Sequence, residues 1–220
     1  MTGYDYMTGV MYTVILGMIL VLFSLAIKPK SNRQLVNSML AAKDREMSCK
    51  PVYSCTKRVI DFIIAVISIL ALLPILLITA LVLFCSGVKT LLRSTVILGP
   101  AGKYVSIYRF NIYNSEGEIT QIGRAIRKSA IEEFPLLWSL LKGDLSLIGL
   151  SKIKQEYVKS VEFDDIAYKY VKPGIASVGA LLCSEEYSRS EIDQLYVRAR
   201  GLKLDILIYG YVMRRAFVKE

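Results

Sequence analysis

An apolar run at residues 59–85 constrains the fold of this chain more than any other feature of its sequence. At 1.5 Å per residue, a helix of this length is long enough to cross roughly 30 Å of hydrocarbon. Only Asp61 and Pro74 interrupt its apolar character. Cations flank the run on both sides: Lys57, Arg58, Lys89 and Arg93. Because Lys and Arg mark the cytoplasmic ends of membrane segments, both ends of the run are predicted to face the cytoplasm.

A helix that enters and leaves a membrane on the same face has to bend. Pro74, near the middle of the run, lacks the N–H that the helical hydrogen-bond ladder needs and supplies a break. We therefore predict a proline-broken re-entrant membrane helix at 57–87 that dips into one leaflet, with Asp61 near the interface beside Lys57 and Arg58. The alternative is an ordinary second transmembrane span, which would place the following domain on the opposite side from Lys28.

A second apolar run, at residues 7–27, carries no charge and is followed at once by Lys28 and Lys30. It predicts an N-terminal transmembrane helix within 1–30, with the N-terminus outside and the rest of the chain in the cytoplasm. A signal peptide is the alternative, but it would need cations ahead of the apolar core and small residues at a cleavage site.

Composition narrows the chemistry that the rest of the chain is able to perform. The net charge of +9 favours anionic partners such as phospholipid headgroups and phosphorylated ligands. Because the chain has no histidine, Ser-His-Asp triads and histidine metal sites are excluded. None of the four cysteines forms a CxxC pair, so they are predicted to be free thiols: Cys49, Cys55, Cys85 and Cys183.

The remaining residues predict an α+β architecture, with a cytoplasmic linker at 31–56 and a small, mostly helical cytoplasmic domain with short strands at 88–220. Residues 104–110 (YVSIYRF) have the alternation of a strand, and 99–102 and 114–117 read as turns. Helices are predicted near 34–45, within 151–170, and at 190–200 and 202–219.

The stretch 123–149 combines a basic cluster with adjacent acids. Arg124, Arg127 and Lys128 stand at i, i+3 and i+4, so on a helix they share one face, while Ile122 and Ile126 occupy another: one face is basic and one apolar. Two neighbouring carboxylates follow, Glu132 and Glu133. Cations that hold phosphate oxygens beside acids that hold a metal, attack or move a proton are typical of a phosphate-handling site.

A purely structural interpretation of the same stretch is also open. Ser129 followed three residues later by Glu132 fits a capping box, which would make Glu132 a helix-start residue. Pro135 would then lie inside that helix, where it removes a hydrogen bond. The first position of a short helix over 135–141 suits the proline better and leaves both glutamates at the mouth of that helix.

Several motifs together resemble one family, the bacterial sugar transferases, which are monotopic polyprenyl-phosphate phosphoglycosyl transferases. The resemblance begins at KRVIDFIIAVISILALLPILL, similar to the family's Lys-Arg-x-x-Asp opening and proline-broken membrane helix, and continues through GKYVSIYRF. It is strongest at ITQIGRAIRKSAIEEFPLLWSLLKGDLSLIG and returns at VKPGIAS and at 202–205 (LKLD). It covers residue 57 to the C-terminus.

The resemblance implies transfer of a sugar 1-phosphate from a nucleoside diphosphate sugar to a polyprenol phosphate, as the first step of exopolysaccharide, capsule or glycan assembly. In the family an Asp-Glu pair works with Mg²⁺, and the Asp attacks the sugar-linked phosphate. The matching residues here are Glu132 as nucleophile and Glu133 as its partner, both also expected at the metal. Basic residues are expected to bind phosphate or substrate: Arg109, Arg124, Arg127, Lys128 and Lys152. The resemblance also places the protein in the bacterial inner (cytoplasmic) membrane, with the catalytic domain facing the cytoplasm.

The sequence departs from the family pattern around this site. Glu132 replaces the family's Asp, and Leu150-Ser151-Lys152 replaces its Pro-Arg-Pro after the shared glycine. A longer acid moves its carboxylate by about one methylene, and a misplacement near 1 Å can cost on the order of 100-fold in rate. A non-catalytic member that binds lipid phosphate or nucleotide sugar, or that regulates an active partner, is the alternative function. Asp144 is a further candidate for the metal, although its Lys-Gly-Asp turn is equally consistent with a structural role. Nucleic-acid binding is not expected, because the cations are not interleaved with aromatic residues in a patch.

Overall fold

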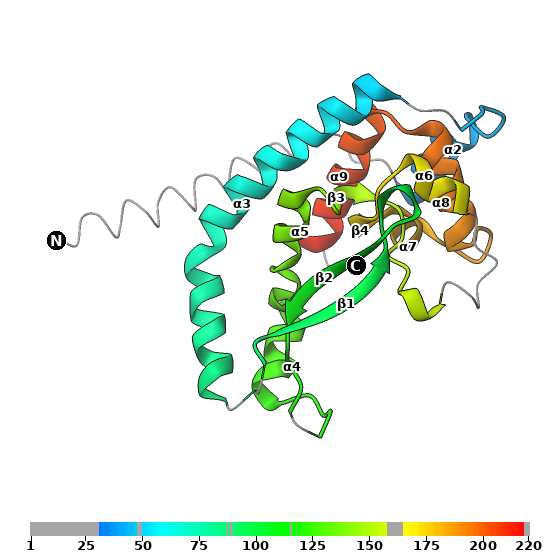
Figure 1. Cartoon of the computed structure of the whole chain (residues 1–220). Helices are drawn as coiled ribbons and strands as arrows, with labels where there is room; N and C mark the ends of the chain where they lie inside the picture. The colour runs from blue at the N-terminus through cyan, green and yellow to red at the C-terminus, as the bar shows by residue number, and fades with distance from the viewer. Residues whose placement is uncertain are drawn as a thin grey trace.

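The computed structural model describes residues 31–47, 50–86, 88, 90–114, 116–157 and 165–217. The predicted N-terminal transmembrane helix lies outside these residues, and so does Cys49. Within them the chain mixes helices with short strands, as predicted (Figure 1). The elements are α2 (Asn32–Leu40), α3 (Pro51–Cys85), β1 (Leu92–Leu98), η1 (Pro100–Gly102), β2 (Tyr104–Phe110), α4 (Gln121–Lys128), η2 (Ile131–Glu133), α5 (Leu136–Lys142), β3 (Ser146–Gly149), η3 (Gln155–Tyr157), α6 (Asp165–Tyr170), β4 (Gly174–Ser177), α7 (Val178–Leu182), α8 (Arg189–Ala199) and α9 (Leu202–Phe217).

Helix α3 runs along one side of the molecule and is visibly bent between its two halves (Figure 1). Its helical assignment is continuous through Pro74, so the proline bends the helix rather than dividing it into two. In the described part of the chain it is the one helix long and apolar enough to cross a membrane. Most of its large apolar side chains are exposed, including Leu70, Leu77 and Phe84 at 63–70%. That α3 re-enters one leaflet stays a prediction.

Helix α3 contacts the rest of the protein on both sides of its bend. In the first half, Asp61 and Ala65 are buried. In the second half, Leu83 joins a small core with Phe110, Ile112 and Ile126, which lie on or near β2 and α4. Each half of α3 therefore packs against the folded domain, and the helix follows the side of the domain that contains β1, β2, α4 and α5.

Within the described residues, the strands form two separate two-stranded sheets. β1 and β2 pair antiparallel from Leu92 opposite Phe110 to Leu98 opposite Tyr104. β3 and β4 pair parallel, with Ser146 opposite Gly174 and Gly149 opposite Ser177. The two glycines of this pair allow a close approach, because a Cβ on Gly174 would collide with the backbone of Gly149.

The main core gathers α2, α6, α7, α8 and α9 around the β3–β4 pair, the grouping seen on one side of Figure 1. The predicted linker at 31–56 contributes to this core, because Leu35, Val36 and Met39 of α2 are almost fully buried. The strand at 104–110 is confirmed, and the helices predicted at 190–200 and 202–219 correspond to α8 and α9. In the region 151–170, only η3 and α6 are described, with residues 158–164 between them outside the described part.

Candidate active site

Helix α4 carries the basic cluster. Its N-cap is Thr120, whose Oγ1 accepts a hydrogen bond from the Gly123 N–H at 2.9 Å. Ile126 is buried, at 7% exposure, and anchors the helix in the small core beside α3. Arg124, Arg127 and Lys128 are all exposed, as expected for one basic face. Ile122 is the exception to the predicted apolar face, because it remains 39% exposed near the C-terminal end of α3.

Ser129 ends α4 and does not begin a new helix. It is the C-cap, and its Oγ lies within hydrogen-bond distance of the carbonyls of Ala125 (3.1 Å) and Ile126 (3.0 Å). The capping-box interpretation is therefore wrong. The Ser129 hydroxyl is directed to carbonyls of α4, and η2, which contains Glu132, has Ala130 rather than Ser129 as its N-cap. The next residue, Ala130, takes a left-handed conformation with φ 58°, and this sharp turn leads directly into η2.

The two glutamates occupy the end of η2, just before Pro135 and α5. Both are half-buried, so they combine protein surroundings with access to solvent. α5 begins at Leu136 with Pro135 as its N-cap, one residue later than predicted. Glu132 and Glu133 therefore lie just before the N-terminus of a short helix, as predicted from the position of Pro135.

Arg109 of β2 reaches Glu133 from the neighbouring strand. Its Nη2 lies 3.3 Å from Glu133 Oε1, with the two side chains 29% and 40% exposed. The Nε of Arg109 is buried and has no hydrogen-bond partner among the described residues. A buried guanidinium nitrogen without an acceptor is costly by itself, and it is a donor available to a ligand oxygen.

Lys152 completes this group from the segment after β3. Its Nζ donates a hydrogen bond to the Ile175 carbonyl at 3.0 Å. Burial lowers the pKa of Lys152, while the carboxylate of Glu133 raises it and the charge of Arg109 lowers it. Three of the predicted residues, Arg109, Glu133 and Lys152, are therefore brought together from three separate segments, and Glu132 is adjacent in the chain.

The carboxylates present suit a metal that is shared with a substrate. No group of three or more Asp, Glu or Cys side chains with metal-ligand geometry occurs in the described ranges. Mg²⁺ is commonly bound by one or two carboxylates together with substrate phosphates, and Glu132 with Glu133 fits that mode. Asp144 does not join them: it lies in the turn beyond the other end of α5, where its N–H donates to the Ser139 carbonyl at 3.0 Å.

Comparison with known proteins decides the family. The family described as bacterial sugar transferase matches residues 52–218, from the first turn of α3 to the end of α9. The chain belongs to the bacterial sugar transferase family.

Individual sugar transferases resemble the chain over about three quarters of its length. A UDP-N-acetylgalactosamine-undecaprenyl-phosphate N-acetylgalactosaminephosphotransferase from Aeromonas hydrophila is 28% identical over 186 residues, which cover 74% of this chain and 44% of the relative. The uncharacterized sugar transferase EpsL from Bacillus subtilis (strain 168) is 29% identical over 178 residues, covering 74% of this chain and 88% of the relative. An undecaprenyl-phosphate glucose phosphotransferase from Komagataeibacter xylinus is 26% identical, covering 72% and 35%. The chain thus spans less than half the length of the Aeromonas and Komagataeibacter relatives.

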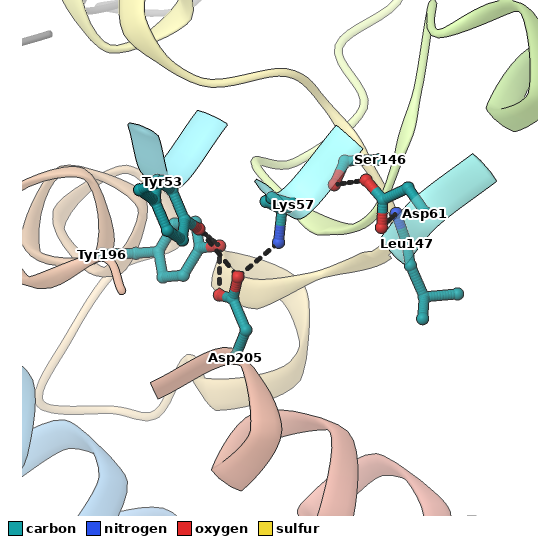
Figure 2. Close-up of polar contacts among 7 residues, drawn as sticks. All are labelled: Tyr53, Lys57, Asp61, Ser146, Leu147, Tyr196 and Asp205. Carbon is teal, nitrogen blue, oxygen red and sulfur yellow. Dashed lines mark hydrogen bonds and ion pairs between the residues drawn. The ribbon is translucent and has the colours of Figure 1, made fainter. Parts of the chain in front are cut away.

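The sequence did not reveal a buried polar network that joins α3 to the rest of the sugar transferase chain. Asp205 of α9 accepts three hydrogen bonds: from Lys57 Nζ at 2.5 Å, from the Tyr53 hydroxyl at 2.7 Å and from the Tyr196 hydroxyl at 2.7 Å (Figure 2). The side chains of Lys57 and Asp205 are only 13% and 10% exposed. We call these residues, together with Asp61 and Ser146, the anchor network.

Asp61 provides the second part of the anchor network, one helical turn after Lys57. Its expected place near the membrane interface stays a prediction; in the structure its side chain is buried, lines one pocket with Lys57 and Arg58, and is turned towards β3. Its carboxylate accepts hydrogen bonds from Ser146 Oγ at 2.6 Å and from the Leu147 N–H at 3.3 Å (Figure 2). Arg58, between them, donates to the carbonyls of Leu140 (2.7 Å) and Leu141 (2.5 Å) at the end of α5.

The Lys57-Arg58-x-x-Asp61 motif therefore fixes α3 to three different elements: α9, α5 and β3. Its spacing places Lys57 and Asp61 on one helix face, which was a visible signal. The spacing could not identify the residues that Lys57 and Asp61 contact, because Asp205 lies 148 residues from Lys57 and Ser146 lies 85 residues from Asp61.

Proposed function

We propose that this protein transfers a sugar 1-phosphate from a nucleoside diphosphate sugar to a polyprenol phosphate, and so initiates exopolysaccharide, capsule or glycan assembly. The observation that carries this proposal is the convergence of Arg109, Glu133 and Lys152 beside Glu132, within a chain of the sugar transferase family. Relatives named as undecaprenyl-phosphate sugar phosphotransferases support the same reaction class.

In the proposed mechanism Glu132 is the nucleophile. A carboxylate oxygen of Glu132 attacks the sugar-linked phosphorus, the bond from that phosphorus to the bridging oxygen breaks, and the nucleoside monophosphate leaves with that oxygen. An oxygen of the polyprenol phosphate then attacks the same phosphorus and releases the Glu132 carboxylate. The product is a polyprenyl diphosphate sugar.

The basic residues hold the anionic substrates in this mechanism. The buried Nε of Arg109 has no hydrogen-bond partner among the residues that the structure describes, and Nη2 of the same side chain contacts Glu133. Arg109 is therefore placed to bind a phosphate oxygen while orienting that acid. Arg124, Arg127 and Lys128 present exposed charge on α4, which suits attraction of the diphosphate and of the lipid headgroup. Mg²⁺, held by Glu132 and Glu133, would supply positive charge for the diphosphate.

The proposed setting is the bacterial inner membrane. The long apolar helix α3 would enter the cytoplasmic leaflet and return to it, and the domain that follows would face the cytoplasm. The exposed apolar side chains of α3 support membrane contact, since a soluble protein rarely exposes so many on one helix. Cysteine labelling of exposed positions after residue 90 in intact cells tests this orientation, and accessibility from the outer side would contradict it.

Transfer is tested with purified full-length protein in nanodiscs, supplied with Mg²⁺, undecaprenyl phosphate and a panel of nucleotide sugars. We expect nucleoside monophosphate to be released with at least one donor, and release to need the lipid for continued turnover. Protein that binds lipid phosphate or nucleotide sugar but releases nothing with any donor would instead be a non-catalytic family member. The replacement of the family's Asp by Glu132 and of its Pro-Arg-Pro by Leu150-Ser151-Lys152 is what keeps this second function in consideration.

A further inference from the structure

A nearly buried carboxylate on α8 joins two separate backbone segments. Asp193 is 5% exposed, and no cation pairs with it among the described residues. Its Oδ2 accepts a hydrogen bond from the Ser151 N–H at 3.0 Å, and its Oδ1 accepts one from the Gly179 N–H at 3.0 Å. Burial raises the pKa of Asp193 to about 6, although hydrogen bonds from Ser151 and Gly179 lower it, so the group is ionised at neutral pH. Both oxygens are then acceptors, and each holds a different segment.

The two segments that Asp193 joins follow the paired strands β3 and β4. β3 ends at Gly149 and β4 at Ser177, and because the pairing is parallel, the chain leaves both strands at the same end of the sheet. The Ser151 N–H belongs to the second residue after β3, and the Gly179 N–H to the second residue after β4. One side chain of α8 therefore fixes both of the segments with which the chain leaves this sheet.

Ser151 is held from its other side by a second buried side chain. Tyr168 of α6 is 2% exposed, and its hydroxyl donates a hydrogen bond to the Ser151 carbonyl. The backbone N–H and the backbone carbonyl of Ser151 are therefore both bonded to side chains from other elements. Since leaving either group unpaired inside the protein costs free energy, the position of this residue is set by α6 and α8 together.

The next residue is Lys152, whose ammonium group lies in the candidate active site. Its backbone position follows from that of Ser151, and its Nζ donates to the Ile175 carbonyl at 3.0 Å. The charges of Glu133 and Arg109 both act on this ammonium group. An ammonium group has three donors, so two remain for the oxygens of a ligand. Lys152 is therefore fixed at its backbone and at its tip, beside the proposed catalytic acids.

We propose that Asp193 is a positioning residue which, together with Tyr168, holds Lys152 where its ammonium group binds an oxygen of the donor diphosphate. The proposal rests on the proposed function for the identity of that ligand. Because lysine has a flexible four-carbon stem, its tip is well placed only when its backbone is fixed. Asparagine at position 193 would keep one acceptor but turn an NH₂ group towards the second backbone N–H, and so would release one of the two segments. Asp193 thus acts through Lys152 and touches no substrate itself.

The test measures binding of inorganic pyrophosphate to the full chain in phosphatidylcholine nanodiscs, with Mg²⁺ and with neither polyprenol phosphate nor sugar donor present. Asp193→Asn and Lys152→Gln are each expected to weaken binding about tenfold. The double variant should also lose about tenfold, because Asp193 acts only through Lys152, whereas independent effects would multiply to about 100-fold. A loss near 100-fold, or unchanged binding in Asp193→Asn, would overturn the proposal.

A matched control is Asp205→Asn, which changes a similarly buried carboxylate that belongs to the anchor network. This variant should keep the affinity of the unmodified protein for pyrophosphate, even where it lowers the unfolding temperature. Equal weakening by Asp205→Asn and Asp193→Asn would overturn the proposal, because it would show a general effect of losing a buried acid.

A milder pair of variants keeps the proposal testable if Asp193→Asn does not fold. Tyr168→Phe removes the hydroxyl that donates to the Ser151 carbonyl and keeps the buried ring. It should weaken pyrophosphate binding about threefold in the unmodified protein but not in Lys152→Gln. Tyr196→Phe removes a hydroxyl of the anchor network from a similarly buried ring and should leave binding unchanged. Equal affinities of Tyr168→Phe and Tyr196→Phe would overturn the proposal.

Failure of this proposal is distinguishable from failure of the proposed function, because pyrophosphate binding needs no turnover. Coupled losses in Asp193→Asn and Lys152→Gln, in a protein that releases no nucleoside monophosphate with any donor, would refute the transfer reaction alone. Release of nucleoside monophosphate together with unchanged pyrophosphate binding in Asp193→Asn would refute the positioning role alone. Pyrophosphate that fails to bind the unmodified protein would overturn the phosphate contact given to Lys152, and the positioning role with it.

Discussion

The anchor network and the candidate active site each combine carboxylates with cations, but they differ in burial and in how fully their polar groups are hydrogen-bonded. In the anchor network, Lys57 and Asp205 lie 2.5 Å apart with side chains 13% and 10% exposed. In the candidate active site, Arg109 and Glu133 lie 3.3 Å apart with side chains 29% and 40% exposed. Asp205 accepts three hydrogen bonds, whereas Arg109 keeps a buried Nε without a partner in the described part of the chain.

The difference shows how to separate a structural acid from a chemical one. An acid whose oxygens are saturated by buried donors has no capacity left for a substrate, and removing it leaves those donors unsatisfied. An acid that is half exposed, beside a cation with a spare donor, contributes little to stability and remains available for chemistry. The two regions should therefore respond to substitution in opposite ways.

The largest contrast is expected from the two glutamates. Glu132→Gln is expected to lower turnover by about 10⁴-fold or more, because the amide is a poor nucleophile. Glu133→Gln should also abolish measurable release. Both variants should keep the unfolding temperature of the unmodified protein, since the ion pair to Arg109 is partly exposed. Nucleoside monophosphate release and thermal unfolding in the same nanodiscs check this, and substantial turnover by either variant would refute the site assignment.

The anchor network should show the reverse behaviour. Asp205→Ala is expected to destabilise the fold by about 3–5 kcal/mol, because it leaves a buried Lys57 ammonium and two tyrosine hydroxyls without their acceptor. Denaturant unfolding of the detergent-solubilised protein measures this. Glu156→Ala is the control, because Glu156 is 64% exposed in its ion pair with Lys154 and should change stability by under about 1 kcal/mol. Similar effects of the two variants would contradict the contrast drawn above.

A smaller effect on rate is expected at Arg109. Arg109→Lys keeps the charge but loses the planar fork and the Nε donor, so turnover should fall by about 100-fold with little change in stability. Arg93→Lys is a close control, since Arg93 lies directly opposite Arg109 in the β1–β2 register but stacks on Tyr113. Steady-state turnover of both variants is measured. An equal fall in turnover for Arg93→Lys and Arg109→Lys would contradict the role given to the contact between Arg109 and Glu133.

The smallest effect tests how Arg58 ties α3 to α5. Gly143 has φ +91°, and a Cβ there would lie 2.8 Å from Arg58 Cζ, so Gly143→Ala should cost about 2 kcal/mol of stability. Gly102→Ala isolates the backbone part, because Gly102 has φ +74° with open space around it. Unfolding midpoints of the two variants measure the difference, and a Gly102→Ala loss as large as that of Gly143→Ala would remove Arg58 from the explanation.

Local patterns predicted much of the fold. The strand at 104–110, the basic face of α4 and the helix after Pro135 all follow from residues close to one another in sequence, where alternation, helical spacing and proline geometry act directly. The exposed Ile122 and the burial of α2 did not follow, because both depend on the tertiary surroundings of α3 and α9.

In the candidate site, too, local features could be predicted from the sequence and contacts between distant segments could not. The pairing of Glu132 with Glu133 is local and was visible, but the approach of Arg109 and Lys152 depends on β2 and on the segment after β3. The hydrogen-bond donors of Asp61 were not predicted for the same reason, because they lie on β3, far from Asp61 in the sequence. Contacts between distant segments are what the sequence of one chain specifies least directly.

The most direct test of this account is to trap the covalent step on Glu132. The protein is mixed with Mg²⁺ and a nucleotide sugar labelled in the phosphate next to the sugar, without acceptor lipid, and is then quenched and mapped by mass spectrometry. We expect a sugar-phosphate adduct on the peptide that contains Glu132, lost in Glu132→Gln and discharged when polyprenol phosphate is added. An active protein that carries no adduct, or an adduct that persists in Glu132→Gln, would contradict the account.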